Sequence, residues 1–210
     1  MQKTGNEVTV KQVHINDSFW SKMQKKIIDI VIPFQERVLN DEVEGVAKSH
    51  AIENFRIAAG LSEGEFYGMV FQDSDVAKWL EGVAYSLTVK PDEALEKRAD
   101  EMIEIIEKAQ QPDGYLNTYF TIKEPERRWQ NLQDCHELYS AGHMMEAAVA
   151  YYQATGKDRL LKVMERMADH IIDRFGEDKV HGIPGHQEVE IGLMKLYRTT
   201  GKEKYKEMAR

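Results

Sequence analysis

Apolar side chains recur at three- and four-residue steps along most of this chain, the spacing that places them on one face of an α-helix. In residues 134–156, Leu138, Met145, Ala148 and Tyr152 form such a stripe. Comparable stripes predict further helices near 17–33, 50–59, 74–89, 92–109, 158–175 and 187–200. The chain is therefore expected to be all-α.

Capping residues indicate where these helices begin and end. Asp134 can accept hydrogen bonds from the free N–H groups of a helix start, and Glu137 follows three residues later, as in a capping box. Gly156 stands where a left-handed C-terminal cap is expected. Pro33 should kink or end the first helix. Only two short segments, residues 8–15 and 115–120, are expected to be extended.

A repeat relates the helices to one another. The pattern Tyr-x-x-Thr-Gly-Lys at 152–157 returns at 197–202, forty-five residues later (197 − 152), and a weaker similarity joins 98–100 to 167–169. Helix pairs that repeat every 40–50 residues or so are typical of an α-solenoid or an α/α toroid. No stop signal follows the last repeat, so residues 1–210 are expected to be the N-terminal part of a longer helical domain.

Composition narrows the classes of function. The net charge of −8 argues against nucleic acid or an anionic membrane surface as a partner. One cysteine, Cys135, allows no internal disulfide and cannot by itself build a thiolate metal site. The N-terminus does not resemble a signal peptide, and the most apolar run is too short to span a membrane. We therefore expect a soluble, cytoplasmic protein.

The polar and aromatic residues lie between helices, at segments 63–75, 111–120, 127–139 and 180–190. Such segments at one end of a helical ring suit a polar ligand of the size of a sugar. His136 and His186 both stand at predicted helix starts, where a neutral ring able to donate and accept hydrogen bonds is favoured. A lone histidine here would more simply be structural, but two equivalent ones favour ligand contact.

Several other residues admit two interpretations. Asp73 and Asp75 could face a sugar, although an ordinary helix-capping role for Ser74 and Asp75 is favoured. Glu188 and Glu190 suit the first turn of a helix, but they could also contribute to a carboxylate pair of a glycosidase assembled within this chain.

The remaining candidates are Trp129 and His143. Trp129, with its two neighbouring arginines, fits either a stacking platform at the rim of a site or a solvated loop. His143 has apolar neighbours and is expected to lie in the core.

Six segments together resemble one family. They are FYGMVFQDSDVAKWLE, QPDGYLNTYF, CHELYSAGH, AAVAYYQATG, HGIPGHQEVEIGL and KLYRTTG, and they look like the N-terminal part of the β-L-arabinofuranosidases of glycoside hydrolase family 127. The resemblance runs from about Val13 to the end of the chain. It implies a six-hairpin α/α toroid followed by β-sandwich domains, with this chain forming the first half of the toroid.

The resemblance also implies a mechanism, and it implies which functional residues this chain would contain. An L-arabinofuranoside would be cleaved with retention by a cysteine thiolate, held near zinc by further cysteines and a glutamate, with another glutamate as acid/base. These groups would lie beyond Arg210, so the resemblance assigns no catalytic residue and no zinc ligand to residues 1–210. Cys135 falls outside the cysteine motif and is expected to pack in the interior. His136 and His186 match histidines that contact the sugar.

One segment departs from the family pattern. The stretch before Ser49-His50 is shorter than in characterised members and lacks their sugar-contacting glutamine. The expected ligand is therefore a non-reducing terminal L-arabinofuranosyl group or a related sugar. Two other readings stay open: a non-catalytic helical-repeat binding module, and another α/α-toroid glycosidase or lyase.

Overall fold

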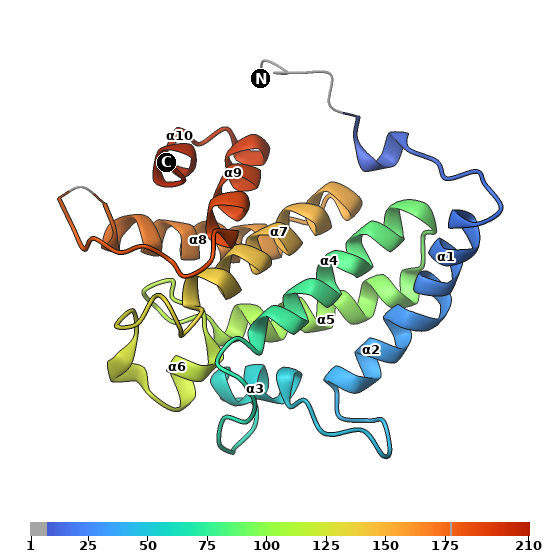
Figure 1. The fold of residues 1–210 in the computed structure, drawn as a ribbon. Coiled ribbons are helices and arrows are strands. Elements are labelled where there is room, and N and C mark those ends of the chain that lie inside the picture. The colour runs from blue at the N-terminus through green and yellow to red at the C-terminus, as the bar shows by residue number, and fades with distance from the viewer. Residues whose placement is uncertain (1–7, 177) are drawn as a thin grey trace.

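The computed structural model describes residues 8–176 and 178–210, and these residues are organised by helices (Figure 1). In chain order they are α1 (Trp20–Lys26), α2 (Ile32–Leu39), α3 (Ala51–Ala58), α4 (Asp73–Val89), α5 (Glu93–Ala109), α6 (Thr118–Ile122), α7 (Glu137–Thr155), α8 (Arg159–Arg174), α9 (Glu188–Thr200) and α10 (Glu203–Met208). Within the described ranges no β-strand forms, and Phe175 and Val180 make an isolated β-bridge. The all-α prediction is confirmed.

The helices form two layers. In one layer α2 packs on α4, α4 on α7 and α7 on α9, while in the other α3 packs on α5, α5 on α8 and α8 on α10 (Figure 1). We call the helices of the first layer inner and those of the second layer outer. Three inner helices continue through a short connection into the outer helix behind them, giving the pairs α4/α5, α7/α8 and α9/α10. This succession of helical hairpins is the arrangement that the forty-five-residue repeat predicted.

The repeated motif ends two inner helices in the same way. Gly156 after α7 and Gly201 after α9 have φ angles of 78° and 73°, in the left-handed region that favours glycine. Their N–H groups donate to the carbonyl groups of Tyr152 and Tyr197, each at 2.8 Å. The sequence repeat is therefore a repeat of helix C-caps.

Two segments that the sequence predicted to be extended contain helical turns instead. Residues 8–15, expected to be extended, contain a 3-10 turn at Val10–Gln12, and residues 115–120 lead into α6. The side chain of Asn117 accepts a hydrogen bond from Phe120 N at 3.1 Å and so caps α6. A local capping interaction therefore converts a predicted extended segment into helix.

Pro33 neither ends nor interrupts the first helical segment. The chain is helical from Trp20 to Leu39, with a π-helical stretch at Ile27–Val31 directly before α2. Pro33 lies in the first turn of α2, where its missing N–H is tolerated. The change in hydrogen-bond pattern takes the place of the predicted break.

The apolar side of this first segment is largely uncovered. Trp20, Ile27, Ile30 and Phe34 are 61%, 50%, 59% and 44% exposed. The predicted stripe is therefore present, but the described residues bury little of it. Contiguous apolar surface of this kind is typical of a face that packs against another element.

The two inner helices α7 and α9 approach closely where α9 begins. A Cβ atom added to Gly142 would lie 2.6 Å from the backbone carbonyl carbon of Glu188, and one added to Gly192 would lie 2.8 Å from the carbonyl oxygen of Gly142. Glycine at both positions therefore lets the helix backbones come into contact. In the described part of the chain, no helix has the length and apolar character needed to cross a membrane.

Candidate functional site

The loops that precede α7 and α9 are joined through their backbones. Gly185 N–H donates to the carbonyl oxygen of Leu132 at 3.2 Å. A Cβ atom at Gly185 would lie only 2.1 Å from the carbonyl oxygen of Gln133, so the loops meet without room for a side chain. The residues that follow them, His136 and His186, are thereby brought to the same end of neighbouring inner helices.

His136, rather than Asp134, is the N-cap residue of α7. Its backbone is left-handed, with φ of 57°, and the helix begins at Glu137. The His136 Nδ1 atom lies 2.5 Å from the carbonyl oxygen of Asp134. A neutral ring that donates from Nδ1 to this carbonyl carries its lone pair on Nε2, which is then free to accept a hydrogen bond.

Glu137 does not form the predicted capping box. Its carboxylate is fully buried and accepts hydrogen bonds from Tyr115 OH at 2.5 Å and Trp129 N at 2.9 Å. Burial raises the pKa of Glu137 to about 7, despite these two donors. The carboxylate thus holds the loop before α7 in place instead of capping the helix.

Trp129 is neither a rim platform nor part of a solvated loop. It is 6% exposed, its ring packs edge-on against Phe175 and Tyr115, and it stacks on His170. The Trp129 Nε1–H group donates to His170 Nε2 at 3.2 Å. These contacts give Trp129 a structural role beneath the loop.

The two predicted histidines contact the same aromatic ring. Tyr139, in the first turn of α7, has its ring centroid 5.5 Å from that of His136 and 4.7 Å from that of His186. His136 also contacts Phe71, with centroids 5.3 Å apart. His136 is partly exposed and His186 is exposed. The fold therefore brings together residues fifty positions apart (186 − 136), while their binding of a sugar stays a prediction.

Lys78 connects the neighbouring inner helix α4 to this aromatic cluster. Its Nζ donates to Tyr139 OH at 2.9 Å and to Ser74 Oγ at 3.1 Å. The ammonium also lies 5.1 Å from the centroid of the Tyr139 ring. Neither Tyr139 nor Lys78 was singled out from the sequence, because their contact with each other forms only across helices.

A group of charged residues lies one turn further along the inner helices. His143 Nδ1 is 3.2 Å from Glu188 Oε1 and 3.7 Å from Glu146 Oε2. Lys195 forms an ion pair with Glu146 and lies 3.6 Å from Glu81 Oε1. His143 is therefore part of a polar contact between α7 and α9, and its predicted place in an apolar core is wrong. Its ring also meets that of Tyr139, with centroids 4.5 Å apart.

Burial and the close approach of the two carboxyl groups shift the pKa values within this group. Burial and the neighbouring Glu146 raise the pKa of Glu188 to about 8. Burial by itself would raise the pKa of Glu146. A hydrogen bond from Glu188 and the Lys195 ammonium outweigh this effect, and the pKa of Glu146 lies below its usual value. Burial lowers the pKa of His143 to about 4. At neutral pH the two carboxyl groups therefore hold a proton between them.

His143, Glu146 and Glu188 could also hold a metal ion by distance, since each offers one ligand atom within 4.8 Å of the others. The Lys195 ammonium already supplies positive charge at Glu146. The cysteine-held zinc implied by the family resemblance does not fit this chain, which has Cys135 alone, and burial raises the pKa of that thiol. The expectation that residues 1–210 bind no metal remains a prediction.

The proton held at Glu188 predicts a pH-dependent stability. Because the pKa is raised from 4.5 to about 8, the folded state keeps a proton that the unfolded chain releases above its own pKa. This contribution is complete below pH 4.5 or so and is lost as the pH rises through about 8. The stability of the wild type relative to Glu188→Gln should therefore fall from pH 5 to pH 9, by at most about 4 kcal/mol, as measured by urea unfolding.

The control for this experiment is Glu190→Gln, which changes an exposed carboxylate two residues further along α9. This variant keeps the Glu188 carboxyl group, so the loss of stability with rising pH should persist in it. The lowered pKa of His143 acts in the opposite direction, because the unfolded chain takes up that proton first as the pH falls. A difference between the wild type and Glu188→Gln that stays constant with pH would contradict the assignment of the proton to Glu188.

Asp73 acts neither as a cap nor as an exposed ligand. It is buried in the first turn of α4 and accepts hydrogen bonds from Thr118 N at 2.8 Å and Thr118 Oγ1 at 2.5 Å. Burial raises the pKa of Asp73 to about 6. The N-cap of α4 is Gln72, whose amide nitrogen donates to the exposed Asp75 at 3.0 Å. Because Ser74 and Asp75 lie within the first turn of α4, the capping interpretation favoured for these two residues is wrong.

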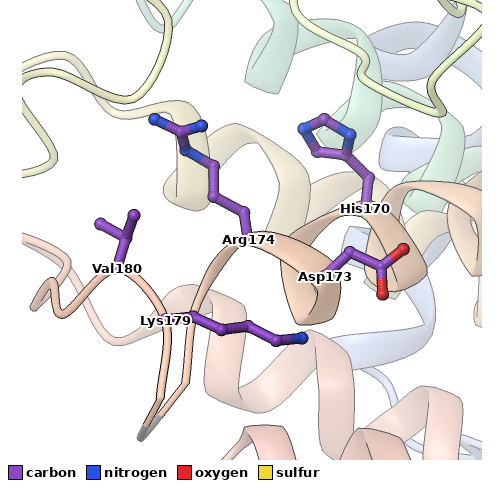
Figure 2. A pocket seen from close by; sticks show the side chains of 5 residues that line it. All are labelled: His170, Asp173, Arg174, Lys179 and Val180. Carbon is purple, nitrogen blue, oxygen red and sulfur yellow. The ribbon is translucent and has the colours of Figure 1, made fainter.

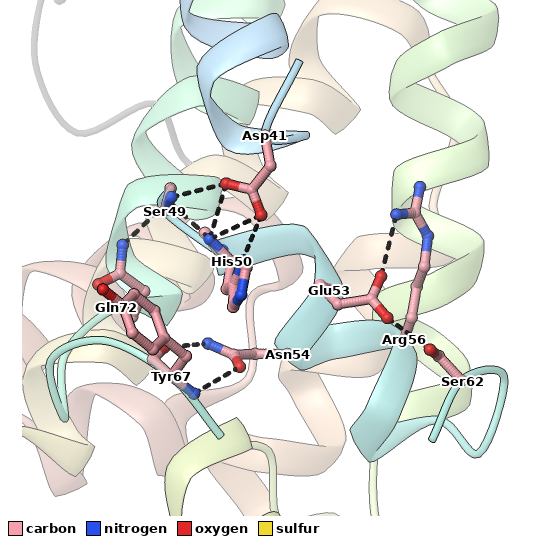
Figure 3. A network of polar contacts seen from close by, with 10 residues as sticks. Asp41, Ser49, His50, Glu53, Asn54, Arg56, Ser62, Tyr67 and Gln72 are labelled. Atoms are coloured by element: carbon pink, nitrogen blue, oxygen red, sulfur yellow. Dashed lines mark hydrogen bonds and ion pairs between the residues drawn. The ribbon is translucent and has the colours of Figure 1, made fainter. Parts of the chain in front are cut away.

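The shortened segment before Ser49-His50 is closed by a polar network (Figure 3). Asp41 accepts hydrogen bonds from Ser49 N at 2.6 Å and His50 N at 3.1 Å, and its carboxylate also contacts His50 Nδ1. Although burial opposes it, these donors hold the pKa of Asp41 below its usual value. Gln72 Nε2 donates to Ser49 Oγ at 3.2 Å, which ties the segment to the start of α4.

A separate hollow of about 510 Å³ lies at the end of α8 (Figure 2). It is lined by His170, Asp173, Arg174, Lys179 and Val180. Its polar groups stabilise the fold, since His170 accepts from Trp129 and Lys179 Nζ donates to a backbone carbonyl of α8 at 2.7 Å. This hollow contains neither of the predicted sugar-binding histidines.

The fold and these contacts define a domain of stacked helical hairpins with histidine, tyrosine and carboxylate groups where inner helices meet. Comparison with known proteins gives the family. A family described as β-L-arabinofuranosidase, GH127 catalytic domain, matches residues 12–210. The chain belongs to this family.

Individual relatives agree with this assignment. A non-reducing end β-L-arabinofuranosidase of Bifidobacterium longum subsp. longum is 44% identical over 211 residues, which cover 92% of this chain and 32% of that protein. The crystal structure of a GH127 β-L-arabinofuranosidase from Geobacillus stearothermophilus T6 has 58% identity and a TM-score of 0.92, covering 94% of this chain and 31% of the other. A GH127 β-arabinofuranosidase structure has 36% identity and a TM-score of 0.86, covering 95% and 32%. The chain thus spans about a third of the length of these relatives.

Proposed function

We propose that this chain forms the N-terminal part of the helical toroid of a glycoside hydrolase and contributes part of its sugar pocket. The sugar would be a non-reducing terminal L-arabinofuranosyl group or a related one. Membership of the GH127 catalytic-domain family supports a hydrolase over a non-catalytic helical-repeat module. The nucleophile, the acid/base and the zinc ligands would lie in later parts of the longer protein.

Uncovered apolar surfaces at both edges of the helical layers support an incomplete toroid. At one edge is the exposed apolar side of α1 and α2. At the other edge, a hollow of about 310 Å³ is lined largely by apolar side chains of α9, α10 and the loop before α9, among them Ile183, Val189, Leu193 and Met208. Further helical hairpins of the longer protein would cover both surfaces.

The sugar-binding role rests on one observation, the contact of His136 and His186 with the same Tyr139 ring. The His136 Nε2 lone pair is available because Nδ1 faces the Asp134 carbonyl. The exposed His186 ring offers a second polar group nearby. Two imidazoles at adjoining helix starts can each bond a hydroxyl group of one sugar.

Replacing either histidine tests this role in the longer protein. His136→Ala and His186→Ala should each lower kcat/KM for a β-L-arabinofuranoside by an amount equivalent to about 1–3 kcal/mol, the cost of an unmade polar contact. Steady-state kinetics on a nitrophenyl glycoside would measure the loss.

His14→Ala is the matched control, because it removes an exposed imidazole to which no role is assigned. It should leave kcat/KM unchanged. If both His136→Ala and His186→Ala behaved like this control, the two histidines would not form part of the sugar pocket.

A further inference from the structure

Tyr139 occupies an unusual position among the inner helices. Its ring contacts three histidines, with centroids 5.5 Å from His136, 4.5 Å from His143 and 4.7 Å from His186. The first two rings meet it nearly perpendicularly, at 90° and 88°, and the third at 64°. His143 belongs to α7, His136 is the N-cap of α7, and His186 belongs to the loop before α9. Tyr139 is thus where the start of α9 meets the start of α7.

These contacts argue against a direct stacking role for Tyr139. Sugars stack on aromatic faces that are open to solvent, but this ring is only partly exposed and has imidazoles on several sides. The Lys78 ammonium also lies 5.1 Å from its centroid. The ring is therefore placed to act on other side chains rather than on a ligand.

The Tyr139 side chain is itself held from two directions. Its hydroxyl group is bonded to Lys78 Nζ at 2.9 Å, which fixes it to α4. Its ring meets His143, whose Nδ1 lies 3.2 Å from Glu188 Oε1 at the start of α9. Tyr139 therefore contacts side chains of α4 and α7 and is linked through His143 to the start of α9, whereas His186 is exposed at the end of a loop.

We propose that Tyr139 is a positioning residue, which sets the His136 and His186 imidazoles relative to each other so that one sugar can bond to both. The proposal deepens the proposed sugar-binding function and rests on it. An exposed imidazole loses rotamer freedom when it binds, and a ring that already restricts it lowers that cost. Loss of the ring would leave both histidines present but no longer aligned.

The experiment compares two substitutions of Tyr139 in the longer protein. Tyr139→Phe keeps the ring and removes the hydroxyl group, and it should retain at least about a third of kcat/KM, because the imidazole contacts remain. Tyr139→Leu removes the ring and should lower kcat/KM by about tenfold to a hundredfold, mainly through KM, as expected for misplaced binding groups. If Tyr139→Leu did not fold, Tyr139→Met would remove the ring with a more adaptable side chain.

Double substitutions separate positioning from an independent effect. If Tyr139 acts through the histidine, Tyr139→Leu combined with His186→Ala should be little worse than the more damaging single change. Losses that multiply would overturn the proposal. Equal losses in Tyr139→Phe and Tyr139→Leu would overturn it as well, because the hydroxyl group rather than the ring would then matter.

Two further outcomes distinguish this proposal from the function on which it rests. If the two histidine variants lost activity but Tyr139→Leu did not, the sugar-binding role would stand and the positioning role would fail. If neither histidine variant lost activity, both would fail. Tyr197→Leu is the control for stability, since it removes another half-buried tyrosine of an inner helix. It should lower Tm without raising KM.

Discussion

Replacing Gly142 by alanine is expected to destabilise the protein by about 3 kcal/mol, at the upper end of the usual cost of overpacking. The new methyl group would lie 2.6 Å from the backbone carbonyl carbon and oxygen of Glu188 and 2.7 Å from Val189 N. Backbone atoms cannot rotate away as the end of a side chain can, so α9 would have to move off α7. Urea unfolding followed by circular dichroism would measure the loss.

Gly82 provides the matched control within another inner helix. A Cβ atom at Gly82 of α4 would have no heavy atom within 4 Å among its non-local neighbours. Gly82→Ala should therefore stabilise the protein by about 0.5–1 kcal/mol, because alanine loses less backbone entropy in a helix. The same glycine-to-alanine change thus has opposite expected signs at the two positions. Similar effects at both would show that α7 and α9 are not in close backbone contact.

The polypeptide 1–210 by itself is expected to hydrolyse no β-L-arabinofuranoside. A thiolate nucleophile with a cysteine-held zinc cannot be assembled from Cys135 alone, and burial raises the pKa of that thiol. Purified 1–210 incubated with a nitrophenyl β-L-arabinofuranoside should release nitrophenol at the uncatalysed rate. The longer protein, assayed in parallel, provides the positive control.

If residues 1–210 did hydrolyse this substrate, the Glu146 and Glu188 carboxyl groups would be the first candidates for the catalytic pair. The sequence left open a carboxylate pair that includes Glu188 without naming its partner, and the structure places Glu188 against Glu146 across two helices. Both members of this pair are largely buried, with side chains 13% and 9% exposed. If activity appeared and vanished in Glu146→Gln, catalysis would reside in this chain, contrary to our expectation.

The fold could be predicted from the sequence where a local pattern determines it. The stripes of α4, α5 and α8 are buried as expected, and Asp92 caps α5 by accepting from Leu95 N at 3.0 Å. The start of α7 was misplaced because Asp134 and Glu137 satisfy the local rule for a capping box. Tertiary contacts decided otherwise, since Tyr115 and Trp129 draw the Glu137 carboxylate into the interior.

The candidate site was only partly predictable for a different reason. His136 and His186 stand out because each lies at a helix start within a polar, aromatic segment. Tyr139, His143 and Lys78 carry no such signal, since their partners belong to helices distant in sequence. The close approach of α7 and α9 at Gly142 brings His143 to Glu188, and a single sequence does not reveal which glycines face another backbone.

The bond between Gly185 N and the Leu132 carbonyl has a consequence for how such proteins can vary. Because this bond joins the two loops, a residue inserted into either loop would displace both His136 and His186. A change in the length of one loop is therefore expected to need a compensating change in the other. Engineering of ligand preference is therefore better directed at side chains outside these two loops, such as Phe71, which touches the His136 ring.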